Sequence, residues 1–231
     1  MTRIKFCGLR RPEDIALANQ FQPDYIGLIF APGKRQISPE QAANLVAKLD
    51  SRIRPVGVFV HETIDRIVAI SAQVGLAAVQ LHGDEGPAEW AALRQKLPFS
   101  TEIWQKLAIP LDPAEASQRA EAFEHTLAAL DPGTARPDVI LLDTEVGGQS
   151  GGTGQTFPWQ QLAAFARRHP VACAGGLNPG TVAAAIAALH PSIVDCSSGI
   201  ERNLEKQADL MDAFCKTVRK LNSFENQTVR K

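Results

Sequence analysis

Short apolar runs alternate with helix-patterned segments along the whole of this 231-residue chain. Most of these runs are continuously apolar, which is typical of parallel strands that helices cover on both faces. The expected strands are residues 3–7, 24–30, 55–60, 77–81, 101–107, 138–143, 171–174 and 193–196. The expected helices begin at residue 12 and then span 39–49, 62–73, 87–96, 113–130, 157–168, 179–189 and 204–221. Eight strand–helix units predict a single (β/α)₈ barrel with parallel strands.

An open, doubly wound sheet of the Rossmann type is the competing fold. That fold places a GxGxxG turn after its first strand, whereas Cys7-Gly8-Leu9-Arg10 stands there in this chain. Composition does not shift along the sequence, so we expect one barrel domain over residues 1–222 and a polar C-terminal tail over residues 223–231.

Charge and composition exclude several classes of partner. The formal net charge is -1 and no long charged block occurs, so the sequence predicts neither nucleic-acid nor membrane-surface binding. No apolar run approaches the length that spans a bilayer, and the chain enters a strand pattern at once without a signal peptide, so we expect a cytoplasmic protein. The four cysteines match no zinc or disulfide pattern and the five histidines are dispersed, so no metal site is predicted.

Two glycine-rich turns indicate the kind of ligand. Gly175 and Gly176 follow the seventh strand, and Ser198 and Gly199 follow the eighth. In a (β/α)₈ barrel these two turns commonly form a phosphate site, because backbone N–H groups and helix N-termini meet there. The loop 147–154 after the sixth strand is also rich in glycine, and is either a connector or a lid whose backbone approaches the phosphate. We therefore expect a phosphorylated small molecule as ligand.

Four polar side chains near the C-terminal ends of strands are candidates for chemistry or binding, since barrel active sites lie there. Cys7 ends the first strand and is either a base or a packing residue, and Asp143 ends the sixth and is either an acid or a turn residue. Arg35 follows the second strand and either binds a carboxylate through its guanidinium fork or is a solvated loop cation. His82 follows the fourth strand and either binds the ligand or orients another group.

The order and spacing of these segments resemble the phosphoribosylanthranilate isomerase family of tryptophan biosynthesis over nearly the whole chain. The matching pieces are Lys5-Phe6-Cys7-Gly8, Gly27-Leu28-Ile29-Phe30, Val56-Gly57-Val58-Phe59-Val60, Val79-Gln80-Leu81-His82-Gly83, Leu141-Leu142-Asp143, Gly151-Gly152-Thr153-Gly154, Gly175-Gly176-Leu177-Asn178-Pro179 and Ser198-Gly199-Ile200-Glu201.

The resemblance implies a cofactor-free Amadori rearrangement of N-(5-phosphoribosyl)anthranilate. It implies that Cys7 is the general base, Asp143 the general acid, and Arg35 the contact of the anthranilate carboxylate. The phosphate is then held by the turns of Gly175, Gly176, Ser198 and Gly199, with help from Gly152 and Gly154, and His82 is counted among the substrate-binding residues. Members of such a family occur as monomers and as homodimers, and the sequence does not decide between them.

Three alternatives remain open. A histidine-pathway aminoaldose isomerase on the same barrel typically has aspartates at both catalytic positions, and Cys7 counts against it. Indole-glycerol-phosphate synthase needs a different acid–base set and an N-terminal extension. A phosphate-ligand binding barrel without catalytic activity would keep the glycine turns but has no need of both Cys7 and Asp143.

Overall fold

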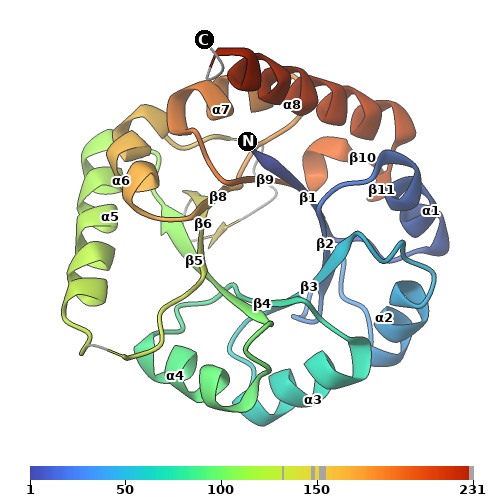
Figure 1. Cartoon of the computed structure of the whole chain (residues 1–231), viewed down its shortest axis with the longest axis horizontal. Coiled ribbons are helices and arrows are strands. Elements are labelled where there is room, and N and C mark those ends of the chain that lie inside the picture. Colours follow the sequence, from blue (N-terminus) through green and yellow to red (C-terminus); the bar gives the residue numbers. More distant parts are fainter. Residues whose placement is uncertain (132, 147–148, 151–154, 229–231) are drawn as a thin grey trace.

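A closed ring of parallel strands lies at the centre of the chain, and helices surround it (Figure 1). The computed structural model describes residues 1–131, 133–146, 149–150 and 155–228. The ring consists of β1 (Arg3–Cys7), β2 (Tyr25–Ile29), β3 (Arg54–Phe59), β4 (Ala78–Leu81), β5 (Glu102–Ile109), β6 (Val139–Val146), β8 (Val171–Cys173) and β9 (Ile193–Cys196). Neighbours pair in that order, and β9 pairs with β1 to close the ring. The predicted (β/α)₈ barrel is therefore confirmed, and an open sheet is excluded.

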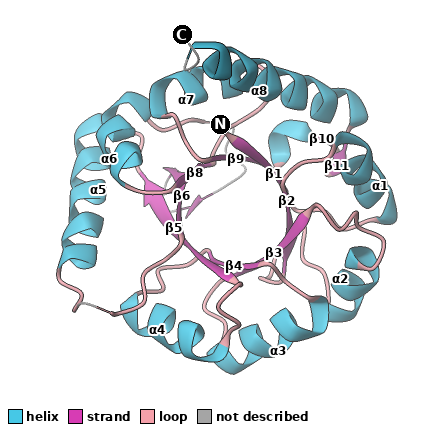
Figure 2. Cartoon of the chain, in the orientation of Figure 1, coloured by secondary structure: helices cyan, strands magenta, loops and turns pink. Residues whose placement is uncertain are grey.

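The helices form the outer layer of the barrel (Figure 2). They are α1 (Pro12–Phe21), α2 (Pro39–Val46), α3 (Ile64–Val74), α4 (Pro87–Lys96), α5 (Pro113–Ala128), α6 (Ala163–Arg168), α7 (Val182–Leu189) and α8 (Ala208–Thr228). Their starts follow local chemistry, as at α2, where the Ser38 hydroxyl accepts a hydrogen bond from the Gln41 N–H and caps the helix. None of the helices in the described ranges has the length and apolar character needed to traverse a membrane.

Two layers of apolar side chains stabilise the barrel. The larger lies between strands and helices and includes Trp90 and Trp159, while the smaller fills the inside of the ring. Tyr25 and Trp104 belong to the inner layer and pack edge to face, with ring centroids 5.1 Å apart. All four cysteines are free and buried. The interior is thus packed at its N-terminal end, which leaves the C-terminal end for a site.

The structure differs from the sequence-based expectations in the last third of the chain. The helix expected over 157–168 is a 3₁₀ turn, η1 (Trp159–Leu162), followed by the short α6. The segment expected to begin a helix at 204 instead forms a hairpin of β10 (Glu201–Arg202) and β11 (Glu205–Lys206). After it, α8 begins at Ala208 and continues past residue 221 to Thr228, so much of the expected tail is helical.

The sixth strand is longer than expected. Strand β6 extends to Val146 and pairs antiparallel with β7 (Gln149–Ser150). The strand therefore carries Asp143 well before its end, and the chain turns back toward the barrel after Val146.

Candidate active site

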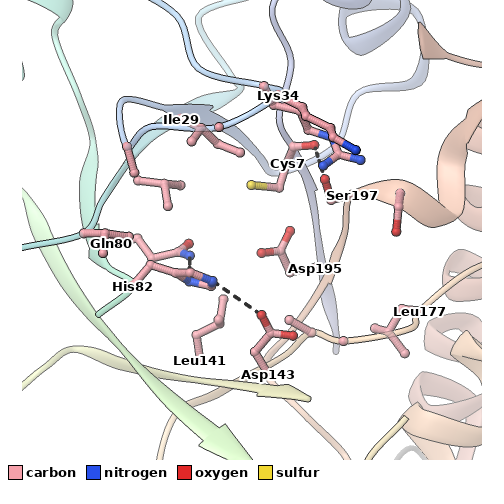
Figure 3. A pocket seen from close by; sticks show the side chains of 18 of the residues that line it. Cys7, Ile29, Lys34, Gln80, His82, Leu141, Asp143, Leu177, Asp195 and Ser197 are labelled. Carbon is pink, nitrogen blue, oxygen red and sulfur yellow. Dashed lines mark hydrogen bonds and ion pairs between the residues drawn. The ribbon is translucent and has the colours of Figure 1, made fainter. Parts of the chain in front are cut away.

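A cavity of about 320 Å³ lies at the C-terminal ends of the strands, where the sequence predicted the site (Figure 3). Seven of the ten predicted site residues line it: Cys7, Arg35, His82, Asp143, Gly175, Gly176 and Ser198. Gly199 lies behind its wall, and Gly152 and Gly154 fall outside the described residues. The structure thus brings both proposed acid–base residues and both phosphate turns to one cavity.

The thiol and the carboxylate come from different sides of the ring. Cys7 ends β1, Asp143 lies in β6, and the strands β8 and β9 separate them. Both side chains are nearly buried, with 8% of Cys7 and 4% of Asp143 exposed, yet both line the cavity. Burial raises the pKa of the Cys7 thiol above its ordinary value. A thiol in this position needs a nearby positive charge before it can serve as a base near neutral pH.

A short chain of polar contacts lies on the Asp143 side of the cavity. His82 Nε2 lies 3.4 Å from Asp143 Oδ2, and His82 Nδ1 lies 2.9 Å from Gln80 Nε2 (Figure 3). With the Gln80 amide nitrogen as donor, His82 Nδ1 accepts and Nε2 is the ring nitrogen on the Asp143 side. Asp143 Oδ1 has no hydrogen-bond partner among the described residues. One carboxylate oxygen thus lies beside His82, and the other is buried without a hydrogen-bond partner among the described residues.

Asp195 is a site residue that the sequence analysis did not single out. It lies in β9, lines the cavity, and faces the space between Cys7 and Asp143 (Figure 3). Its Oδ2 accepts a hydrogen bond of 2.6 Å from the buried Lys5 ammonium. Burial raises the pKa of this carboxyl group, and Lys5 opposes that shift. A charged residue ending an otherwise apolar run was the available signal, the same one that pointed to Asp143.

Arg35 is held by residues far along the chain. Its Nη2 and Nε donate to the two oxygens of Glu201 at 2.6 and 3.0 Å, and Glu201 is also 2.7 Å from Lys206 Nζ. Lys206 donates in addition to the main-chain carbonyl groups of Cys7 and Ser197. The hairpin β10–β11, which the sequence analysis missed, therefore connects Arg35 to the end of β1 and to the turn after β9.

The two glycine turns touch each other. A Cβ atom at Gly199 would lie 1.9 Å from the Leu177 carbonyl oxygen, so only glycine permits this approach of the turn after β9 to the turn after β8. Gly175 has a φ of 75°, and a Cβ there would lie 2.2 Å from Thr144 Oγ1. Among the described residues, the backbone N–H groups of Gly175, Gly176 and Ser198 donate no hydrogen bond to another backbone group. These free donors surround one end of the cavity.

No group of three His, Cys, Asp or Glu side chains within the described ranges is placed to hold a metal ion.

Comparison with known proteins identifies the family. The model of the N-(5'-phosphoribosyl)anthranilate isomerase family matches residues 4–217. The chain belongs to this family. The enzyme of that name from Thermoanaerobacter sp. (strain X514) is 36% identical over 219 residues, which cover 95% of this chain and 98% of the relative. The Acetivibrio thermocellus enzyme is 38% identical over 224 residues, covering 95% and 96%.

Solved structures of the family have the same fold. The phosphoribosyl anthranilate isomerase of Thermotoga maritima superimposes with a TM-score of 0.80 at 30% identity, covering 95% of this chain and all of the other. A second structure of the family holds reduced 1-(o-carboxyphenylamino)-1-deoxyribulose 5-phosphate, and it superimposes with a TM-score of 0.76 at 29% identity over 95% of this chain and all of its own.

Proposed function

We propose that this protein catalyses the Amadori rearrangement of N-(5'-phosphoribosyl)anthranilate to 1-(2-carboxyphenylamino)-1-deoxyribulose 5-phosphate. The observation that carries the proposal is the meeting of Cys7, Asp143 and the two glycine turns in one cavity. Membership of the isomerase family supports the same reaction. The reaction needs an acid on one side of the sugar and a base on the other, with the phosphate end of the sugar held in place.

Asp143 is the proposed general acid. Opening the furanose ring requires a proton on the ring oxygen, and a protonated Asp143 at the cavity wall can supply it. His82 Nε2 lies 3.4 Å from Asp143 Oδ2 and helps to fix the direction of the carboxyl group. Ring opening leaves a Schiff base between the anthranilate nitrogen and C1, which makes the proton on C2 more acidic.

Cys7 is the proposed general base. Its thiolate removes the proton from C2, and the resulting enolamine tautomerises to the ketone product. Each positioned acid or base of this kind contributes roughly 10²- to 10⁴-fold to the rate. The thiol and the carboxyl group line opposite parts of the same cavity, so both can act on one bound sugar without moving past each other.

Arg35 is the proposed contact of the anthranilate carboxylate. Glu201 occupies the Nε–Nη2 edge of the guanidinium group, and within the described residues Nη1 donates no hydrogen bond. A guanidinium has five donors in two usable edges, so the Nη1–Nη2 edge can bind a second carboxylate. Glu201 thus fixes the plane of Arg35 while its other edge stays available to the substrate.

The free N–H groups of the turns after β8 and β9 are the proposed phosphate site. Gly175, Gly176 and Ser198 contribute them at the cavity wall, and Gly199 lets the two turns meet. Backbone donors converging at the start of helices bind phosphate without a cationic side chain. We extend this site to Gly152 and Gly154 on the strength of the sequence alone.

The proposal extends to location and assembly. We place the reaction in the cytoplasm, which the four free cysteines support. The Thermotoga maritima relative has been described both as a dimer and as generated monomers, and we propose that this chain is active as a monomer or as a homodimer with one complete site per chain.

The test is a fluorescence assay that follows loss of the anthranilate adduct with purified protein and a chelator present. Turnover under these conditions is the expected result, and absence of turnover with undiminished binding of a product analogue would indicate a binding barrel instead. Turnover of the histidine-pathway aminoaldose substrate, with none of the anthranilate adduct, would assign the chain to the other isomerase.

A further inference from the structure

A buried ion pair lies directly beside the proposed base. Lys5 precedes Cys7 by two residues on β1, and alternate side chains of a strand share a face, so both point into the barrel. Lys5 is wholly buried and its Nζ lies 2.6 Å from Asp195 Oδ2. Desolvating two charges offsets most of what their attraction gains, so a buried pair is weak evidence of a stabilising role. Its place at the cavity suggests a role in the chemistry.

Lys5 also acts on the thiol. Both side chains lie on one face of β1, and the charge of Lys5 lowers the pKa of Cys7 against the effect of burial. Burial alone disfavours a charge on Lys5, but Asp195 and Cys7 outweigh it and hold the pKa of Lys5 above its ordinary value. Lys5 therefore remains an ammonium group at the pH at which the enzyme works, on the same strand face as the one thiol that the reaction uses.

We propose that Lys5 is a positioning residue that stabilises the thiolate of Cys7, and that Asp195 limits this effect by holding part of the same charge. The inference rests on the proposed role of Cys7 as general base. Lys5 and Asp195 then have opposite effects on the pKa of Cys7. The Lys5 ammonium group stabilises the thiolate, whereas the Asp195 carboxylate competes with the thiolate for that ammonium group. A pair that only stabilised the fold has no reason to act in opposite directions on the thiol.

The other charged groups near Cys7 are committed elsewhere. Lys206 of β11 donates to the Cys7 main-chain carbonyl and pairs with Glu201, and Arg35 pairs with Glu201 through two donors. The residue of strand β2 that packs against the thiol is Gly27, which carries no charge. On the side of Asp195 away from Cys7, Asp143 raises the pKa of Asp195 and His82 lowers it. Lys206 and Arg35 are unchanged in the variants below, and Lys5 is the cation with the largest effect on the pKa of Cys7.

The experiment measures the rate at which iodoacetamide alkylates Cys7 as a function of pH, followed by mass spectrometry of the Cys7 peptide in the full-length protein. Cys7→Ser gives the background, which is expected to be low because burial raises the pKa of Cys173, Cys196 and Cys215. For Lys5→Met the midpoint of the profile should rise by about one to three pH units, the usual effect of losing an adjacent opposite charge. For Asp195→Asn the midpoint should fall.

Two further variants guard against a folding artefact. Lys5→Met combined with Asp195→Asn removes both charges together, and its midpoint should lie between those of the two single variants, because Asp195 also raises the pKa of Cys7 through its own charge. Arg54→Met removes a cation from the 2.6 Å ion pair with Glu102 at the opposite end of the barrel, and its midpoint should match the wild type. Shifts of the same sign in Lys5→Met and Asp195→Asn, or no shift in either, would overturn the inference.

The readout separates this inference from the proposed function. Alkylation reports the thiolate whether or not the enzyme turns over. Opposite shifts together with a fully active Cys7→Ser variant would support the coupling of Lys5 to the thiol and refute the base. Unchanged profiles together with an inactive Cys7→Ser variant would refute the coupling and leave the base in place.

Discussion

Replacing Glu201 by glutamine is the most severe test of the idea that Glu201 holds Arg35 in place. The Glu201 side chain is 4% exposed and accepts hydrogen bonds from two cations, Arg35 at 2.6 Å and Lys206 at 2.7 Å. Glutamine keeps the shape of the side chain but loses the charge, and its NH₂ group must face one of the two cationic donors. The variant therefore leaves two positive groups beside one neutral amide.

The cost follows mainly from Lys206, whose side chain is 1% exposed. Removing one partner of a buried ion pair costs about 3–5 kcal/mol, because the other charge remains buried without compensation. A domain of this size loses roughly 2–4 °C in Tm per kcal/mol. We therefore expect Tm to fall by about 6–20 °C, as measured by differential scanning calorimetry. Arg35 is partly exposed and adds less.

The difference in Tm between wild type and Glu201→Gln should depend on pH in a definite direction. Burial raises the pKa of Glu201, but the hydrogen bonds and charges of Arg35 and Lys206 outweigh burial and leave that pKa below its ordinary value. A carboxylate with a lowered pKa in the folded state contributes stability above its unfolded pKa of about 4.3 and loses it as pH falls further. The gap in Tm between wild type and Glu201→Gln should therefore narrow below about pH 4.3.

Activity should change in KM more than in kcat, because Arg35 contacts the non-reacting carboxylate of the substrate in our proposal. Glu205→Gln is the matched control: this residue lies on the same hairpin, is 53% exposed at its side chain, and pairs with Arg11. Exposed pairs contribute little, so its Tm and KM should stay near those of the wild type. A Glu201→Gln variant with unchanged Tm and unchanged KM would refute the reasoning.

Two further substitutions probe the remaining parts of the cavity. Gly199→Ala places a methyl group 1.9 Å from the Leu177 carbonyl oxygen. The affinity for a phosphorylated product analogue, measured by calorimetry, should therefore fall at least ~10-fold. Unaltered affinity would contradict the phosphate site. Gln80→Met removes the amide group that donates to His82 Nδ1. We expect kcat to fall about 10- to 100-fold with KM nearly constant, the usual effect of losing a group that orients a functional side chain. An unchanged kcat would contradict the proposed orientation of Asp143.

The barrel itself was predictable from local pattern. Continuous apolar runs such as those of β2 and β6 form strands because both of their faces are buried, and every predicted strand appears within a few residues of its expected place. Cys7 and Asp143 were found because they are polar residues in or at the end of such strands. Asp195 carries the same signal, but the glycine turn that follows its strand, at Ser198 and Gly199, indicates a phosphate site and not a third acidic group.

The hairpin β10–β11 was not predictable in the same way. Its turn places Asn203 and Leu204 in the left-handed region, with φ of 54° and 63°. Asparagine adopts this conformation readily and leucine seldom does, so Leu204 was interpreted as the start of a helix. The partner of Arg35 was hidden for another reason. Glu201 lies 166 residues further along the chain, and no local pattern reports a contact of that range.

The most direct test compares wild type, Cys7→Ser and Asp143→Asn in the fluorescence assay of isomerisation, with affinity for the reduced product analogue measured in parallel. The account predicts that kcat falls by at least about 100-fold in each variant, since each removes a positioned acid or base, while analogue affinity stays within about tenfold. Normal turnover by either variant would contradict the claim that this thiol and this carboxyl group act together on one bound sugar.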